Sequence, residues 1–149
     1  MQKAVDELIQ VFDFEGFELV IKKHPLSEFE VSDKIVIVDS MLSTLEFLHV
    51  ADVIVTDYSA VLFEALMMTK PIYFYAFDKE SYMENRDFYM DYETEMPGKI
   101  SVDANALMKN IEDGAMEHQK IVEYRDKMIV PCKESYTKDF VAFLRGSLD

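Results

Sequence analysis

The chain has 149 residues, half of them hydrophobic, with only four Gly and four Pro, which predicts one folded domain over residues 1–149 rather than a disordered chain. Its formal net charge of −14 argues against a nucleic-acid partner and against unaided adhesion to an anionic membrane. A single cysteine, Cys132, fits a reducing compartment, and neither a signal peptide nor a membrane-spanning run is present, so we expect a cytoplasmic location.

The first predicted elements alternate between helix and strand. Apolar residues from Val5 to Phe12 recur at helical spacing, and this helix is expected to end at Glu15-Gly16. Apolar runs at 17–21 and 35–38 then predict two short strands.

A basic loop, Lys22-Lys23-His24-Pro25, follows the first of these strands. Ligands of open α/β sheets bind at the carboxyl ends of strands, so His24 stands where a catalytic residue would lie. The alternative is a loop histidine beside two solvated lysines. The loop also argues against a receiver domain of the flavodoxin type, which has an acidic cluster at this place.

The next helix is predicted by Ser43 and Glu46, which have the spacing of a capping box. Residues 51–75 then form the unit around which the chain is organised. Val53-Ile54-Val55 predicts a strand buried on both faces, residues 61–68 predict a helix, and Pro71 opens a second strand over 72–75. This is the strand–helix–strand unit of a parallel sheet.

The turn inside this unit suggests an anion site. Thr56, Asp57 and Ser59 are helix-start residues, and the unpaired N–H groups of a helix start attract phosphate. Ser59 and Ala60 are small enough for a ligand to approach the backbone, and Glu64 could accept hydrogen bonds from sugar hydroxyls. A capped helix in any doubly wound domain explains the same pattern.

The remainder predicts a long loop followed by helices. Residues 78–93 are rich in charged and aromatic side chains, which is typical of a functional loop, and Pro97-Gly98 predicts a turn. Helices are expected from Asp103 or Asn105 to Gly114, over 116–128 and over 135–144. No cluster has metal-ligand spacing, and we predict neither a metal nor a cofactor.

Taken together, several of these segments resemble the CDP-glycerol glycerophosphotransferases, the family of teichoic-acid polymerases and primases. Lys23-His24-Pro25, residues 51–59 and residues 70–75 are similar to three segments of that family. Further residues recur in the family's order: Asp78, Tyr82, Arg86, Phe88, Tyr89, Asp91, Tyr92, Pro97 and Gly98.

The resemblance implies an α/β fold: a Rossmann-like three-layer domain with a mainly parallel sheet, the C-terminal donor-binding half of a GT-B fold. It implies that Ser59 and Ala60 hold the pyrophosphate of CDP-glycerol, that Glu64 holds the ribose, and that His24 stabilises the leaving phosphate, with Lys23 adding charge. Arg86 either meets a phosphate or ties down its own acidic loop. Thr56 and Asp57 are expected to shape the turn.

The chain departs from the family pattern at several positions. Ala60 stands where the family often has a second serine, Glu64 where it commonly has Asp, and Asp87 where it has Gly. The family's N-terminal His-Gly-Thr motif is absent, so we expect an excised or truncated chain that binds donor but turns over poorly without the missing N-terminal domain.

These observations predict transfer of glycerol phosphate from CDP-glycerol to a hydroxyl of a polymer or lipid-linked acceptor in teichoic acid synthesis. In the full-length enzyme this would occur at the cytoplasmic face of the membrane, with any membrane contact made through other regions. The alternatives are a GT-B transferase that uses CDP-ribitol or a nucleotide sugar, and a non-catalytic nucleotide-binding module.

Overall fold

The computed structural model describes residues 1–24, 27–31, 36–37, 43–85, 91–114, 116–129 and 135–147. Its elements, in chain order, are α1 (Gln2–Val11), β1 (Val20–Ile21), β2 (Val36–Ile37), α2 (Thr44–Val50), β3 (Ile54–Thr56), α3 (Val61–Met67), β4 (Ile72–Tyr75), α4 (Lys79–Asn85), α5 (Tyr92–Glu95), β5 (Lys99–Ser101), α6 (Ala104–Glu112), α7 (His118–Met128) and α8 (Tyr136–Gly146).

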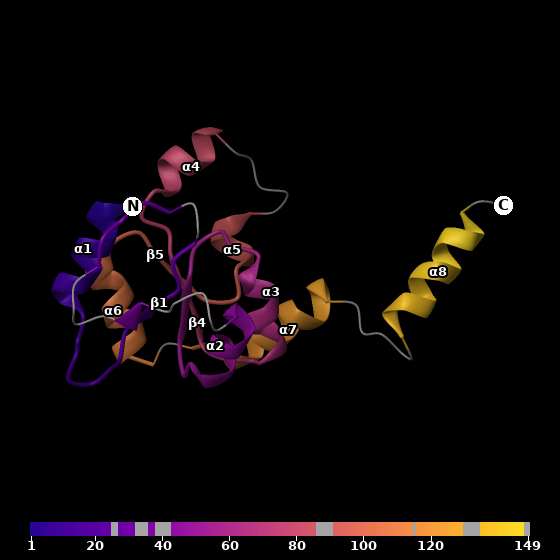
Figure 1. Cartoon of the computed structure of the whole chain (residues 1–149), viewed down its shortest axis with the longest axis horizontal. Coiled ribbons are helices and arrows are strands. Elements are labelled where there is room, and N and C mark those ends of the chain that lie inside the picture. Colours follow the sequence, from indigo (N-terminus) through magenta and orange to yellow (C-terminus); the bar gives the residue numbers. More distant parts are fainter. Residues whose placement is uncertain are drawn as a thin grey trace.

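All strand pairs of the described residues are parallel, which confirms the predicted α/β class. The strands form two ladders, β1–β2 and β3–β4–β5, rather than one continuous sheet. The helices between consecutive strands of the larger ladder supply the crossovers that parallel pairing requires. Figure 1 shows the sheet with helices on both of its faces.

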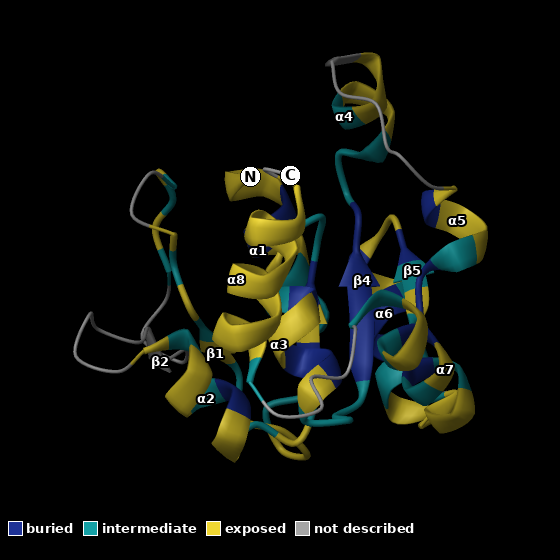
Figure 2. Ribbon diagram, turned by 90° about the vertical axis from the view of Figure 1, so that its right-hand side faces the viewer, coloured by how far each residue is buried: buried dark blue, intermediate teal, exposed yellow. Residues whose placement is uncertain are grey.

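The core lies on the two faces of β4, whose four residues are all buried. Ile72 and Phe74 face one way and pack in a cluster with residues of α3 and α7. Tyr73 and Tyr75 face the other way and pack with residues of α1 and α6, including Ala4 and Leu107. This alternation along one strand produces a three-layer arrangement, and the buried strand stands out at the centre of Figure 2.

The sequence predicted that the strand at 53–55 would be buried on both faces, but the strand buried in this way is β4. In β3 the side chain of Val55 is 41% exposed, while Ile54 and Thr56 are buried. Among the described residues, β3 pairs with β4 alone, at one end of the three-stranded order β3–β4–β5.

Several predicted boundaries were wrong. Helix α1 ends at Val11 instead of Gly16, because Phe12 has an extended backbone and the Asp13 carboxylate accepts the N–H groups of Glu15 and Gly16 in a separate turn. The first strand is only Val20–Ile21. The segment read as one long loop contains α4 and α5, and strand β5 after Gly98 was not predicted at all.

Two local features hold the central unit in place. The Lys70 ammonium donates to the carbonyl oxygens of Ala51 (2.7 Å) and His49 (3.1 Å), so it satisfies groups at the carboxyl end of α2. Gly98 lies against the sheet, where an added Cβ would stand 2.1 Å from the carbonyl oxygen of Ile72. Lys70 of the Lys-Pro pair and Gly98 of the Pro-Gly turn therefore each have a structural role in the fold.

Helix α8 differs from the other helices, since all of its residues are exposed. Figure 1 shows it standing clear of the remaining elements. Its N-cap is Ser135, which agrees with the predicted start of this helix. Across the described residues, no helix combines the length and the apolar character needed to cross a membrane.

Candidate functional site

The segment that runs from the end of β3 through a turn into α3 carries five of the predicted site residues: Thr56, Asp57, Ser59, Ala60 and Glu64. The Asp57 carboxylate accepts a hydrogen bond from the Ser59 N–H (3.0 Å), and the Ser59 hydroxyl accepts one from the Val61 N–H (3.4 Å). Helix α3 itself begins with Ala60 at the N-cap, where no side chain caps it. The expected helix-start residues therefore bond within the turn, before the helix.

Exposure separates these residues by position. Thr56 is buried at the end of β3 and Asp57 is half-buried, whereas Ser59 and Ala60 are exposed. The Ser59 N–H already has the Asp57 carboxylate as its acceptor, so an anion bound at this amide would share the N–H with it. The turn thus presents small exposed residues at the carboxyl end of a parallel strand, as an anion site requires.

Aromatic rings surround this turn. The ring of Tyr58 stacks on Tyr82 of α4, with centroids 3.9 Å apart and planes 20° apart, and its centroid lies 5.2 Å from that of Tyr92. The Tyr92 hydroxyl donates to the carbonyl oxygen of Asp57 at 3.2 Å. Burial raises the pKa of both Tyr58 and Tyr92 well above the ordinary tyrosine value, and the Asp78 carboxylate adds to the rise at Tyr58. Both hydroxyls therefore remain protonated near neutral pH.

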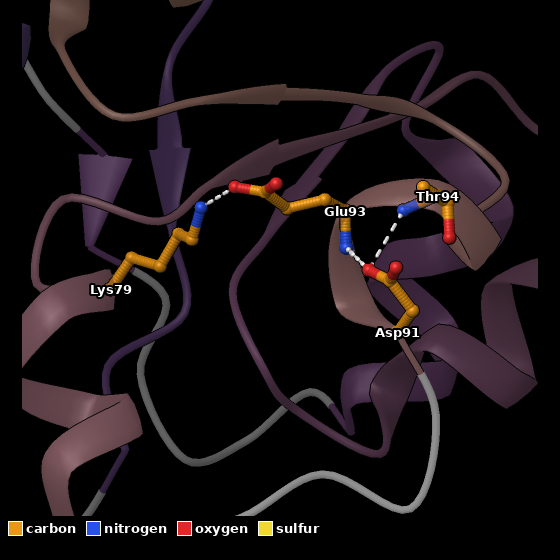
Figure 3. A network of polar contacts seen from close by, with 4 residues as sticks. All are labelled: Lys79, Asp91, Glu93 and Thr94. Carbon is orange, nitrogen blue, oxygen red and sulfur yellow. Dashed lines mark hydrogen bonds and ion pairs between the residues drawn. The ribbon is translucent and has the colours of Figure 1, made fainter.

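Helices α4 and α5 are joined beside the turn, as Figure 3 shows. Lys79 at the start of α4 forms an ion pair with Glu93 of α5. Asp91 caps α5, because its carboxylate accepts the N–H groups of Glu93 (3.0 Å) and Thr94 (3.3 Å). These contacts connect the two helices that supply Tyr82 and Tyr92.

Glu64 lies further along α3, on its exposed side. It borders a hollow of about 440 Å³ whose other lining residues are apolar or aromatic: Phe63, Met67, Met128, Ile129 and Tyr136. A hollow of this size is in the range of small-molecule sites. A carboxylate at the edge of apolar side chains can accept hydrogen bonds from a hydroxyl-bearing ligand whose ring packs on those side chains.

The two predicted residues of the basic loop lie elsewhere, after β1 in the smaller ladder. His24 is exposed, and its carbonyl oxygen accepts the Ser27 N–H at 2.9 Å. Lys23 points into its own loop, where its ammonium donates to the Phe29 carbonyl (2.7 Å) and lies 4.8 Å from the centroid of the Phe29 ring. The Lys23 ammonium is thus already hydrogen-bonded to a carbonyl oxygen of its own loop. Pro25 and Arg86 lie outside the described residues.

Sequence reasoning gave no structural role to three residues that this geometry singles out: Tyr58, Tyr92 and Lys70. Tyr58 and Tyr92 surround the turn, and Lys70 fastens α2 to the unit that contains it. Tyr92 lies in a segment rich in charged and aromatic residues that gives no clear periodicity, so only the fold shows that it belongs to the core. No group of three or more potential metal ligands occurs in the part of the chain that the structure describes.

The parallel strands, the helices on both sheet faces and the exposed turn after β3 define a Rossmann-like α/β domain of the kind that forms one half of a GT-B fold. Residues 6–132 match the family described as CDP-glycerol:poly(glycerophosphate) glycerophosphotransferase. The chain belongs to that family.

Curated relatives include enzymes of both glycerol and ribitol phosphate. The chain is 34% identical to the teichoic acid ribitol-phosphate polymerase TarL of Staphylococcus aureus, covering 73% of this chain and 20% of TarL. It is 30% identical to the teichoic acid ribitol-phosphate primase of Bacillus spizizenii (82% of this chain, 31% of the relative) and 31% identical to the teichoic acid glycerol-phosphate primase of Bacillus subtilis (76% and 30%). The chain therefore spans less than a third of each of these relatives.

Solved structures agree on the fold. The wall teichoic acid polymerase TagF soaked with CDPG for 30 minutes superposes with a TM-score of 0.73 at 20% identity, covering 99% of this chain and 39% of that one. A second TagF structure gives a TM-score of 0.68 at 22% identity, with 97% and 37% covered. The predicted Rossmann-like half of a GT-B fold is confirmed by this likeness.

Proposed function

We propose that this chain is the donor-binding domain of a CDP-glycerol glycerophosphotransferase, active in the synthesis of teichoic acid or a related cell-surface polymer. Its family membership supports the reaction class. The observation that carries the assignment of the site is the exposed Ser59–Ala60 turn at the carboxyl end of β3, next to Glu64 and its apolar hollow. Ligands of open α/β sheets bind at this end of the strands.

In this proposal the donor lies along the start of α3. Its pyrophosphate approaches the backbone at Ser59 and Ala60, where the small side chains leave room. Its ribose hydroxyls donate to the Glu64 carboxylate, and its base packs on the apolar side chains of the neighbouring hollow. Thr56 and Asp57 shape the turn: Thr56 is buried, and the Asp57 carboxylate accepts the Ser59 N–H.

The reaction replaces one phosphorus–oxygen bond with another. An acceptor hydroxyl, deprotonated by a general base, attacks the glycerol-bearing phosphorus, and CMP leaves with the electron pair of the broken bond. His24 stabilises the charge that develops on the leaving phosphate, and Lys23 adds positive charge. Arg86 either meets a phosphate or ties down its own acidic loop. We place the reaction at the cytoplasmic face of the membrane, with a polymer or lipid-linked acceptor.

A ribitol donor is a second candidate, because two of the relatives described above are ribitol-phosphate enzymes. Both donors share the cytidine diphosphate part, so the contacts proposed for Ser59, Ala60 and Glu64 are the same for each. Competition between CDP-glycerol and CDP-ribitol for this chain measures the choice directly.

Calorimetric titration of Glu64→Gln tests the proposal. The substitution removes a charge-assisted acceptor, so CMP and CDP-glycerol binding is expected to weaken by about 1.5–3 kcal/mol while inorganic pyrophosphate binding stays nearly unchanged. Glu112→Gln on α6 is the matched control, since Glu112 is also an exposed helical glutamate and α6 packs on the other sheet face. Equal weakening for all three ligands, or no weakening for any, would contradict the role of Glu64.

A further inference from the structure

Tyr92 is a core residue whose polar end reaches the proposed donor site. Its side chain is only 4% exposed, and its ring packs in the core cluster around Phe74, with the two ring centroids 5.9 Å apart. Its hydroxyl donates to the carbonyl oxygen of Asp57 at 3.2 Å, a contact between residues 35 positions apart. One side chain thus connects the interior of the domain to the turn after β3.

Asp57 connects the Tyr92 hydroxyl to the exposed part of the turn. Its carbonyl oxygen accepts the Tyr92 hydroxyl, and its carboxylate accepts the Ser59 N–H at 3.0 Å. The peptide groups on either side of Tyr58 are therefore fixed by two hydrogen bonds that meet at one residue.

Rings from two helices hold Tyr58 at the same place. Tyr82 of α4 stacks on it, Tyr92 of α5 lies beside it at 5.2 Å, and the Lys79–Glu93 ion pair joins α4 to α5. Neither Ser59 nor Ala60 has a buried side chain to set its own position. Through Asp57, the hydrogen bond from Tyr92 connects their backbone to the core.

We propose that Tyr92 is a positioning residue of the donor site, fixing the backbone at Ser59 and Ala60 for the pyrophosphate of a nucleoside diphosphate ester. This inference rests on the function proposed above. Tyr92 does not touch the ligand and acts through Asp57. Because burial keeps the hydroxyl protonated, the bond to Asp57 persists through the physiological pH range.

Tyr92→Phe tests the inference, and Tyr75→Phe provides a closely matched control. Tyr75 is also buried (8% exposed), and its hydroxyl also donates to a backbone carbonyl oxygen, that of Ala4, at the same distance of 3.2 Å. Tyr75 lies on the opposite face of β4, in the cluster with α1 and α6. Each substitution removes one hydroxyl and keeps the ring, so a purely structural role predicts the same loss of stability and the same ligand binding for both.

The expected result separates the two variants. Both melt at similar temperatures, but Tyr92→Phe binds CMP and CDP-glycerol about three- to tenfold more weakly than wild type, and Tyr75→Phe binds them normally. Amide hydrogen exchange at Ser59 and Val61 is faster in Tyr92→Phe alone, because the turn has lost its anchor.

Three outcomes would overturn the inference. Wild-type affinity and wild-type exchange in Tyr92→Phe would show that the hydroxyl positions nothing. Equal weakening in both variants would show that general stability, not position, governs binding. If the wild-type chain binds neither CMP nor CDP-glycerol, the proposed function is wrong, and the donor role of Tyr92 is wrong with it. If the wild-type chain binds them normally, a negative result for Tyr92→Phe contradicts only the role of Tyr92.

Discussion

The two strand ladders of this domain differ in how firmly they fix the residues proposed for function. Around β3–β4–β5, the turn that carries Ser59 accepts a hydrogen bond from the buried Tyr92 of α5, and its Tyr58 ring stacks on Tyr82 of α4. Around β1–β2, each strand has two residues, and none of the described residues between 17 and 31 is buried. The Lys23 ammonium is bonded to a carbonyl of its own loop. The turn proposed for donor binding is thus tied to the core through Tyr92, whereas the position of His24 depends on little core packing.

Gly98→Ala is expected to destabilise the sheet β3–β4–β5, the more firmly packed of the two strand ladders. The new Cβ would stand 2.1 Å from the Ile72 carbonyl oxygen and 3.1 Å from the Phe74 ring, so strand β4 or the turn must shift. We expect a loss of about 3 kcal/mol or more in the free energy of unfolding, measured by urea denaturation.

Gly146→Ala in α8 is the matched control for this substitution, since a Cβ there meets nothing within 4 Å. It is expected to be neutral or slightly stabilising, because alanine favours a helix over glycine. A Gly98→Ala variant as stable as wild type would show that the packing of the β4–β5 region is looser than described.

His24→Ala examines the other ladder, in an active enzyme that contains this domain. If His24 stabilises the leaving phosphate, turnover falls about a hundredfold while the Michaelis constant changes little. Because His24 is exposed, thermal stability should not change. An increase in the Michaelis constant with normal turnover would instead indicate ground-state binding, and no change in either constant would indicate a loop residue without function.

Lys70→Met tests the link between α2 and the central unit. Methionine keeps an apolar stem but loses the two hydrogen bonds to the carbonyl oxygens of His49 and Ala51. A charged donor contributes about 1.5–3 kcal/mol, and we expect a loss of this order in urea denaturation. Lys3→Met is the control, because the Lys3 side chain is 89% exposed and pairs only with Glu7 one helical turn away. Similar stability in both variants would show that Lys70 does not anchor α2.

Short-range signals predicted the structure where the interaction partners lie close in sequence. The capping box formed by Ser43 and Glu46, the Asp103 cap and the strand after Pro71 are confirmed. For the two caps the deciding contacts join residues three positions apart, so local chemistry is sufficient.

Contacts between distant parts of the chain could not be predicted in the same way. The edge position of β3 depends on which strands pair, and the three residues of β5 gain their strand geometry from β4. The predicted donor turn is present as one strand–turn–helix, yet the ring of Tyr92 and its bond to Asp57 arise from residues 35 positions apart. Periodicity carries no signal for such a contact. The roles of His24, Lys23, Ser59, Ala60, Glu64 and Arg86 remain predictions.

The smallest expected effect concerns the capping box of α2. Hydrogen bonds from the Ser43 N–H and hydroxyl hold the pKa of Glu46 below its ordinary value of 4.5. A carboxyl whose pKa is lowered in the folded state stabilises that state above its unfolded pKa, and this contribution is lost as the pH falls through the folded value. The stability difference between wild type and Glu46→Gln should therefore shrink on acidification below 4.5. A difference independent of pH would contradict this origin.

Chemical-shift mapping of CMP and CDP-glycerol on the isotopically labelled chain tests whether the turn after β3 is a nucleotide site. We expect saturable shifts of the amides from Ser59 to Glu64, with little change at the amides of α6 on the opposite sheet face. Absence of any shift near Ser59 at millimolar ligand, or shifts confined to other elements, would contradict it.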